Sequence, residues 1–81
     1  MHEHHLVEAI LEDILRRVEE EGASRVTRIT MRLGGLTELD EETIRHLFAD
    51  RARGTPCEGA GIVFERSDRR ELTLVSIDVE E

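Results

Sequence analysis

The five residues at the start of the chain have the clearest capacity for metal chemistry, and they read Met1-His2-Glu3-His4-His5. The Met1 α-amine, the His2 amide nitrogen and the His2 imidazole can form adjacent chelate rings around one divalent ion. The fourth position could be taken by the Glu3 amide nitrogen, by the His4 or His5 ring, or by a carboxylate. Nitrogen donors in one plane suit Ni(II) and Cu(II). We expect Met1 to be retained, because removal of an initiator methionine generally needs a small second residue.

This ligand set would respond to pH and has a simpler competing explanation. An amine and an imidazole bind a metal only after losing their protons, so metal affinity is expected to fall below about pH 6–7. In the competing explanation, His2, His4 and His5 precede the first helix and have no specific role, since histidine-rich starts are common as adventitious chelators. The residues alone do not favour one explanation over the other.

Length, charge and cysteine content exclude several classes of protein. Eighty-one residues form one domain, residues 1–81, with a thin core. The net charge of −8 argues against a nucleic-acid partner and is compatible with a cation or a basic partner. Cys57 is the only cysteine, which rules out a disulfide within the chain. Apolar runs are too short to cross a bilayer and no signal-peptide pattern is present, so we expect a cytoplasmic location.

Hydrophobic periodicity predicts the first helix and the first strand. Apolar residues recur at helical spacing over residues 6–18, and Gly22 is a suitable residue to end that helix. Residues 26–33 alternate as a half-buried strand that ends at Gly34-Gly35. The alternation places Thr27, Ile29, Met31 and Leu33 on one face of the strand and Val26, Arg28, Thr30 and Arg32 on the other.

The second half of the chain predicts a helix and two strands. The helix begins at Asp40, ends near Arg53 and buries a stripe of Ile44, Leu47 and Phe48. Strands are predicted at residues 62–66 and 71–80, paired as a hairpin around Ser67-Asp68, with a β-bulge or a change of partner near Leu74-Val75. The fold class is α+β, in the order α-β-α-β-β, with two helices covering one face of a three-stranded sheet. Free hairpin edges are compatible with a homodimer or with strand exchange.

The order of short motifs along the chain resembles the HypA/HybF family of nickel metallochaperones. The matching stretches are Met1-His2-Glu3, Ala9-Ile10-Leu11-Glu12, Val26-Thr27-Arg28-Ile29, Leu33-Gly34-Gly35-Leu36, Gly54-Thr55, Glu58-Gly59-Ala60, Glu71-Leu72 and Val79-Glu80. They occur in this order from residue 1 to residue 80, so the resemblance extends over nearly the whole chain. The start is the most specific of them, because its chemistry requires the free terminus.

The resemblance implies that the protein is a chaperone and not an enzyme. It implies delivery of Ni(II) for maturation of nickel-iron hydrogenase, and in some organisms urease. Its expected partners are a HypB-like GTPase that loads nickel and the hydrogenase large subunit. The resemblance also implies that His2 is a nickel ligand, with the Met1 amine and the His2 and Glu3 backbone nitrogens. The alternative function is an interaction module without metal, which docks on the GTPase or a hydrogenase subunit through its acidic helices.

Two departures from the family pattern stand out. The family carries a zinc module with two CxxC pairs between the strands that here end near Arg66 and begin near Glu71, where this chain has only residues 67–70. No zinc is therefore expected, because a closed zinc site needs four ligands and Cys57 stands alone. A natural variant and an engineered deletion would both give this arrangement. The second departure is His4-His5, whose extra rings could alter the geometry or bind a second metal weakly.

The other candidate residues have ordinary structural explanations. We interpret Cys57 as a packing thiol and His46 as a surface residue. The cluster Asp40-Glu41-Glu42 is better explained by the positive end of the helix dipole than by acid–base catalysis. The sequence contains no phosphate-binding loop, nucleophile elbow or catalytic triad pattern, in agreement with a protein that is not an enzyme.

Overall fold

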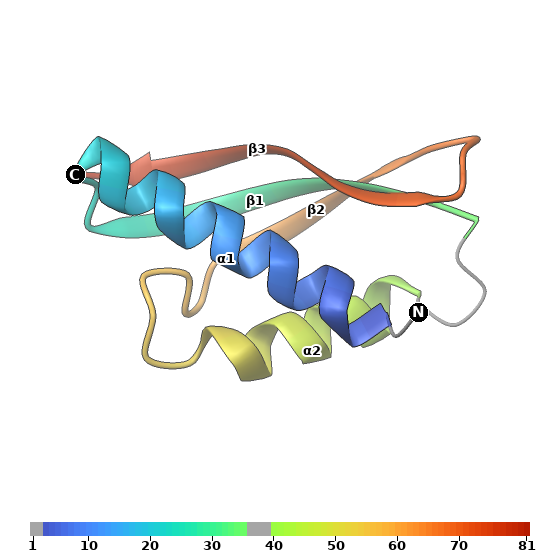
Figure 1. Cartoon of the computed structure of the whole chain (residues 1–81), viewed down its shortest axis with the longest axis horizontal. Coiled ribbons are helices and arrows are strands. Elements are labelled where there is room, and N and C mark those ends of the chain that lie inside the picture. The colour runs from blue at the N-terminus through green and yellow to red at the C-terminus, as the bar shows by residue number, and fades with distance from the viewer. Residues whose placement is uncertain (1–2, 36–39) are drawn as a thin grey trace.

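The computed structural model of the chain describes residues 3–35 and 40–81, with side chains from His5 onward. Its elements, in order, are α1 (Glu3–Glu21), β1 (Arg25–Gly34), α2 (Glu41–Ala52), β2 (Gly61–Arg66) and β3 (Glu71–Glu80) (Figure 1). Both helices lie on the same side of a three-stranded sheet. This confirms the predicted α+β class and the order α-β-α-β-β.

The sheet has the order β2-β1-β3, so β1 is its central strand. β1 runs parallel to β2 and antiparallel to β3, and Thr30 pairs with Val63 on one side and with Ser76 on the other. The predicted hairpin is therefore wrong, because β2 and β3 lie on opposite sides of β1. A short polar link is the usual sign of a hairpin, but here the link crosses the end of the central strand.

The crossing depends on a glycine at the end of β1. The Ser67 amide donates to the Leu33 carbonyl at 3.1 Å, which holds the link against the strand. A Cβ atom at Gly34 would lie 2.2 Å from the Ser67 carbonyl oxygen and 2.5 Å from that of Arg69. No side chain fits in that space, so the crossing requires Gly34. The first glycine of the pair that was predicted to end β1 therefore also allows β2 and β3 to lie on opposite sides of β1.

The two helices bury aliphatic and aromatic side chains against the inner face of the sheet. Helix α1 ends at Glu21, where Gly22 adopts a φ of +68°, as predicted. Ile14 at its centre is fully buried, which contributes about 1.5–3 kcal/mol relative to exposure. The buried core residues are Val7, Ile10, Leu11, Ile14 and Val18 of α1, Val26, Ile29 and Met31 of β1, Ile44, Phe48 and Ala52 of α2, and Cys57 and Leu72.

Helix α2 begins as predicted, with Asp40 as its N-cap. The Asp40 carboxylate accepts a hydrogen bond from the Thr43 amide at 2.8 Å, and this bond lowers the pKa of Asp40. The helix ends at Ala52, and Gly54 adopts the left-handed conformation with a φ of +76°. In the predicted stripe, Ile44 and Phe48 are fully buried, whereas Leu47 is only partly buried.

The pairing of β1 with β3 contains two register shifts. The first corrects the predicted faces of β1, and the second confirms the predicted bulge in β3. Val26 pairs with Val79 and Arg28 pairs with Asp78, so Thr27 is an extra residue in β1. The predicted faces of Val26 and Thr27 are therefore wrong: Val26 is fully buried and Thr27 is exposed. Further along, Thr30 pairs with Ser76 and Met31 with Leu74, which leaves Val75 as an extra residue of β3. The predicted bulge near Leu74-Val75 is confirmed.

Replacing Gly34 by alanine should destabilise the fold, because the new Cβ would overlap the carbonyl oxygens of the crossing. We expect the free energy of unfolding in urea to fall by about 1–3 kcal/mol or more. Gly61→Ala is the matched control, since its nearest neighbour would be the Thr27 carbonyl oxygen at 3.8 Å. This control should change stability by less than about 1 kcal/mol. Equal effects of the two substitutions would contradict the role given to Gly34.

Candidate metal centre

The residues predicted to bind metal, residues 1–5, include the first described residues of α1. Met1 and His2 lie outside the described residues, and so do the side chains of Glu3 and His4. The backbone of Glu3, His4 and His5 forms the beginning of the helix, and the His5 side chain is exposed. In the part of the chain that the structure describes, no three His, Cys, Asp or Glu side chains are grouped to hold a metal ion. The candidate centre therefore stays a prediction from the sequence, with the Met1 α-amine, the His2 imidazole and backbone amides as its donors.

The position of Glu3 at the N-terminal end of α1 leaves its backbone nitrogen available for metal binding. The first N–H groups of an α-helix have no carbonyl partner within the helix. The Glu3 nitrogen can thus lose its proton and bind a metal without breaking the hydrogen-bond ladder of α1. The N-terminal end of a helix dipole also favours negative charge, by about 0.3–1 kcal/mol at an exposed site. That sign suits a deprotonated amide nitrogen.

The folded body begins within about one turn of this end of α1. Val7 is fully buried in the core, and Glu8 forms an ion pair with Arg51 of α2, with 3.2 Å between the Glu8 Oε2 and Arg51 Nε atoms. Both charged side chains are partly exposed, so the pair contributes at most about 1 kcal/mol. The packing of Val7 and Ile10 supplies the stronger attachment. From Val7 onward α1 is therefore fixed against the core, while the His5 side chain before it is exposed.

The remaining histidine and the acidic cluster have the structural roles that were predicted. His46 Nε2 lies 3.6 Å from Glu42 Oε1 on the surface of α2, and both side chains are exposed. Asp40 caps the helix, and Glu41 forms an ion pair with Arg45 at 3.7 Å. These carboxylates stabilise the start of α2 and form no acid–base pair.

Cys57 is a core residue, as predicted. Its side chain is 1% exposed and packs in the cluster that joins the helices to the sheet. Its amide donates to Thr55 Oγ1 at 3.1 Å. Burial raises the pKa of the Cys57 thiol to about 11. Metal binding requires the thiolate, so this environment disfavours Cys57 as a ligand.

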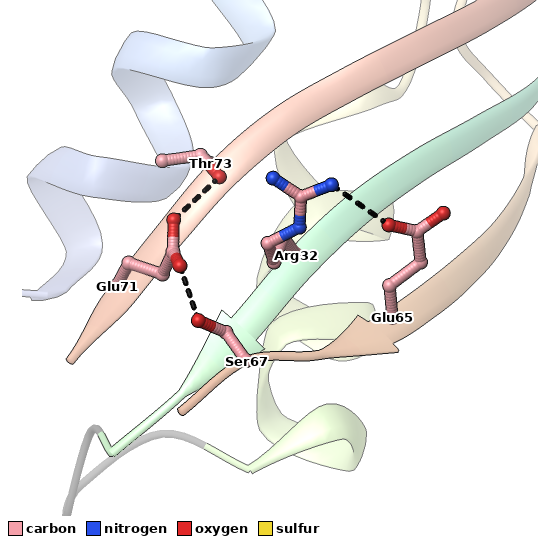
Figure 2. A network of polar contacts seen from close by, with 5 residues as sticks. All are labelled: Arg32, Glu65, Ser67, Glu71 and Thr73. Carbon is pink, nitrogen blue, oxygen red and sulfur yellow. Dashed lines mark hydrogen bonds and ion pairs between the residues drawn. The ribbon is translucent and has the colours of Figure 1, made fainter. Parts of the chain in front are cut away.

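The sequence analysis missed a polar network at the crossing (Figure 2). The Glu71 carboxylate accepts hydrogen bonds from Ser67 Oγ and from Thr73 Oγ1, the second at 3.1 Å, and the bond from Ser67 is the main cause of its lowered pKa. Beside it, Arg32 Nη2 pairs with Glu65 Oε1 at 3.1 Å across β1 and β2. The opposite charges of Arg32 and Glu65 were visible in the sequence, but their pairing follows only from the observed strand order.

Comparison with solved structures identifies the class of fold. The chain superposes on the solution structure of the nickel metallochaperone HypA from Helicobacter pylori with a TM-score of 0.68, over 94% of this chain and 72% of that one. Sequence identity in this match is 15%, so it establishes the fold alone. The small α+β domain described above is thus the fold of a known metallochaperone.

Sequence comparison then places the chain in a family. Residues 1–71 match the family model described as "Hydrogenase/urease nickel incorporation, metallochaperone, hypA". The hydrogenase maturation factor HypA of Pyrococcus furiosus is 38% identical over 84% of this chain and 49% of its own length. The HypA of Archaeoglobus fulgidus is 39% identical over 89% of this chain and 67% of its own length. The chain belongs to the HypA family, whose members are metallochaperones and not enzymes.

The chain spans about half to two thirds of the length of these relatives. The family model ends at Glu71, the first residue of β3, whereas the structural match extends over 94% of the chain. Of the helices in residues 3–35 and 40–81, none is long and apolar enough to cross a membrane.

The burial of Cys57 predicts a thiol that reacts slowly in the folded protein. With a pKa of about 11, only about 0.1% of the thiol is ionised at pH 8. We expect the reaction with a disulfide reagent at pH 8 to be at least about 100-fold slower in the native protein than in 6 M guanidinium. The same protein in denaturant is the control. A native rate close to the denatured rate would contradict the core position of Cys57.

Proposed function

We propose that this chain is a single-domain nickel metallochaperone that binds one Ni(II) ion at its N-terminus and delivers it to a nickel enzyme. Membership of the HypA family supports nickel as the cargo, and hydrogenase or urease maturation as the destination. The observation that carries the proposal is the match to the HypA family model over residues 1–71, a range that includes the Met1-His2-Glu3 start.

In the proposed complex, the ligands are the Met1 α-amine, the His2 amide nitrogen and the His2 imidazole. The Glu3 amide nitrogen, the His4 or His5 ring, or a carboxylate completes the site. The arrangement with the Glu3 amide has two deprotonated amides, which neutralise the charge of Ni(II) while the amine and the imidazole bind as neutral donors. Such a complex does not place a net positive charge at the N-terminal end of the α1 dipole. The helix start therefore supports the arrangement with two backbone nitrogens.

The partners follow from the proposed role. A chaperone of this family would act in the cytoplasm with a HypB-like GTPase and pass nickel to the hydrogenase large subunit. We propose that this chain does so without zinc, because its single cysteine is buried with a raised pKa. Cu(II) binds planar nitrogen sites more tightly than Ni(II) does. Selection of nickel would therefore depend on metal availability and on the partner that accepts the ion.

The proposal predicts that nickel binding depends on His2 and on a free terminus. Isothermal titration of the untagged protein should show about one Ni(II) per chain. His2→Ala, or two extra residues before Met1, should weaken binding by at least about 100-fold, because either change removes a donor from the chelate. His46→Ala removes a surface imidazole outside this set and is the matched control.

Unchanged stoichiometry and affinity in both altered N-termini would exclude the proposed centre. The alternative function, an interaction module without metal, would then remain. It predicts that a HypB-like GTPase captures the wild type and His2→Ala equally well. If His4→Ala or His5→Ala weakens nickel binding in addition to His2→Ala, the fourth ligand is a histidine ring and not the Glu3 amide.

The proposed ligands also predict the pH dependence of nickel binding. The amine and the imidazole have ordinary pKa values of about 7.7–8.0 and 6.5, and both must be deprotonated to bind. Affinity should therefore decrease as the pH falls from 8 to 6, and the decrease should exceed tenfold. Titrations in two buffers of different ionisation enthalpy would count the protons released on binding. Affinity that is constant over this range would contradict amine and imidazole ligation.

A further inference from the structure

The crossing between β2 and β3 carries arginines that the rest of the fold does not use. All eleven basic residues of the chain are arginines. In the described residues, ion pairs within 4.0 Å involve Arg16, Arg17, Arg28, Arg32, Arg45, Arg51 and Arg53. Arg66, Arg69 and Arg70 are exposed and form no such pair in this part of the chain. Three arginines with no ion pair within 4.0 Å in the described residues thus lie within five residues, in a protein of net charge −8.

The acidic groups that flank the crossing are partly compensated. The pKa of Glu71 is lowered mainly by its hydrogen bond from Ser67, and also by the charges of Arg32 and Arg69. Glu65 pairs with Arg32, and Glu71 accepts hydrogen bonds from Ser67 and Thr73 (Figure 2). Asp68 lies within the crossing and is exposed. With Arg32 and the three arginines of the crossing counted against Glu65, Asp68 and Glu71, this surface carries a net charge of +1 at neutral pH. The crossing is therefore a local cationic surface.

The backbone that presents these arginines is held in place. The Ser67 amide donates to the Leu33 carbonyl at 3.1 Å, and the Arg69 amide donates to Ser67 Oγ at 3.0 Å. The close contact with Gly34 fixes the link against the end of β1. Binding of a partner would thus cost little backbone entropy in residues 66–70, and only the arginine side chains would need to be immobilised.

We propose that this crossing, residues 66–70, is a docking surface for a short acidic segment of a partner protein. Guanidinium groups bind carboxylates through two parallel hydrogen bonds, which suits arginine better than lysine. The molecule is 36 Å long, and the crossing lies at the opposite end of the sheet from the C-terminus and the acidic end of α1, Glu19–Glu21 (Figure 1). The Debye length is about 8 Å at physiological ionic strength, so a short segment at the crossing is screened from those carboxylates. This surface goes beyond the proposed nickel function and does not require the metal.

The test is an NMR titration of the full, ¹⁵N-labelled chain with a synthetic peptide of about ten residues that alternates Glu and Gly. We expect chemical-shift changes at residues 66–71 and at Leu33–Gly35, and weaker binding as salt is raised. Arg69→Gln with Arg70→Gln should weaken binding by roughly three- to tenfold, since each exposed pair is worth up to about 1 kcal/mol. The matched control is Arg16→Gln with Arg17→Gln, which removes the same charge from residues already paired with Asp13. This control should bind like the wild type.

Equal weakening in the two double variants, or shift changes centred away from the crossing, would overturn the proposal. Inorganic pyrophosphate, titrated under the same conditions, separates carboxylate from phosphate recognition, and tighter binding of pyrophosphate at residues 66–70 would also overturn it. Wild-type spectral dispersion in each variant shows that the fold is retained, and Arg66→Gln provides an independent substitution on the same surface. Nickel titration of Arg69→Gln with Arg70→Gln should give wild-type affinity, so a failure here is distinct from a failure of the nickel proposal.

Discussion

The architecture depends on one close contact, the passage of the β2–β3 link over Gly34 at the end of β1. Because the link lies against that glycine, β2 and β3 can pair with opposite sides of the same strand. β1 therefore becomes the centre of the sheet, with Ile29 and Met31 buried on its inner face. A single apolar face follows, and α1 and α2 both cover it. A larger residue at this position would push the link away from β1. β2 and β3 could then no longer pair with opposite sides of that strand.

The sequence predicted those features that local patterns determine. The two helices, the Asp40 cap and the glycine at the end of α1 all follow from periodicity and from single-residue preferences. The bulge at Val75 was also predictable, because an apolar alternation that slips by one residue must insert an extra residue. The bulge at Thr27 left a similar trace, since Val26 and Ile29 are three residues apart and both buried. That trace was missed because Thr27 fitted the alternating pattern of the residues after it.

The strand order could not be predicted from local patterns. A four-residue polar link between two strands is typical of a hairpin, and nothing within residues 66–71 distinguishes a hairpin from a crossing. The difference lies in Gly34, more than thirty residues earlier, which only the folded chain brings against Ser67 and Arg69. The network of Arg32, Glu65 and Glu71 was hidden for the same reason. The candidate metal centre, unlike the strand order, was predicted from residue type and position alone. The structure shows in addition that Glu3 belongs to α1.

A metal centre made from a terminal amine and backbone nitrogens places few demands on the fold. The proposed centre needs only a neighbouring helix that is fixed to the core, and Val7 and Ile10 of α1 provide that packing. Nothing in such a centre relies on the connection between β2 and β3. That connection is four residues long, residues 67–70, and the core still closes around β1. The first part of α1 is held by Val7 and Ile10, whereas the arginine-bearing crossing is held by Gly34 and Ser67, so a change at one of them need not be transmitted to the other.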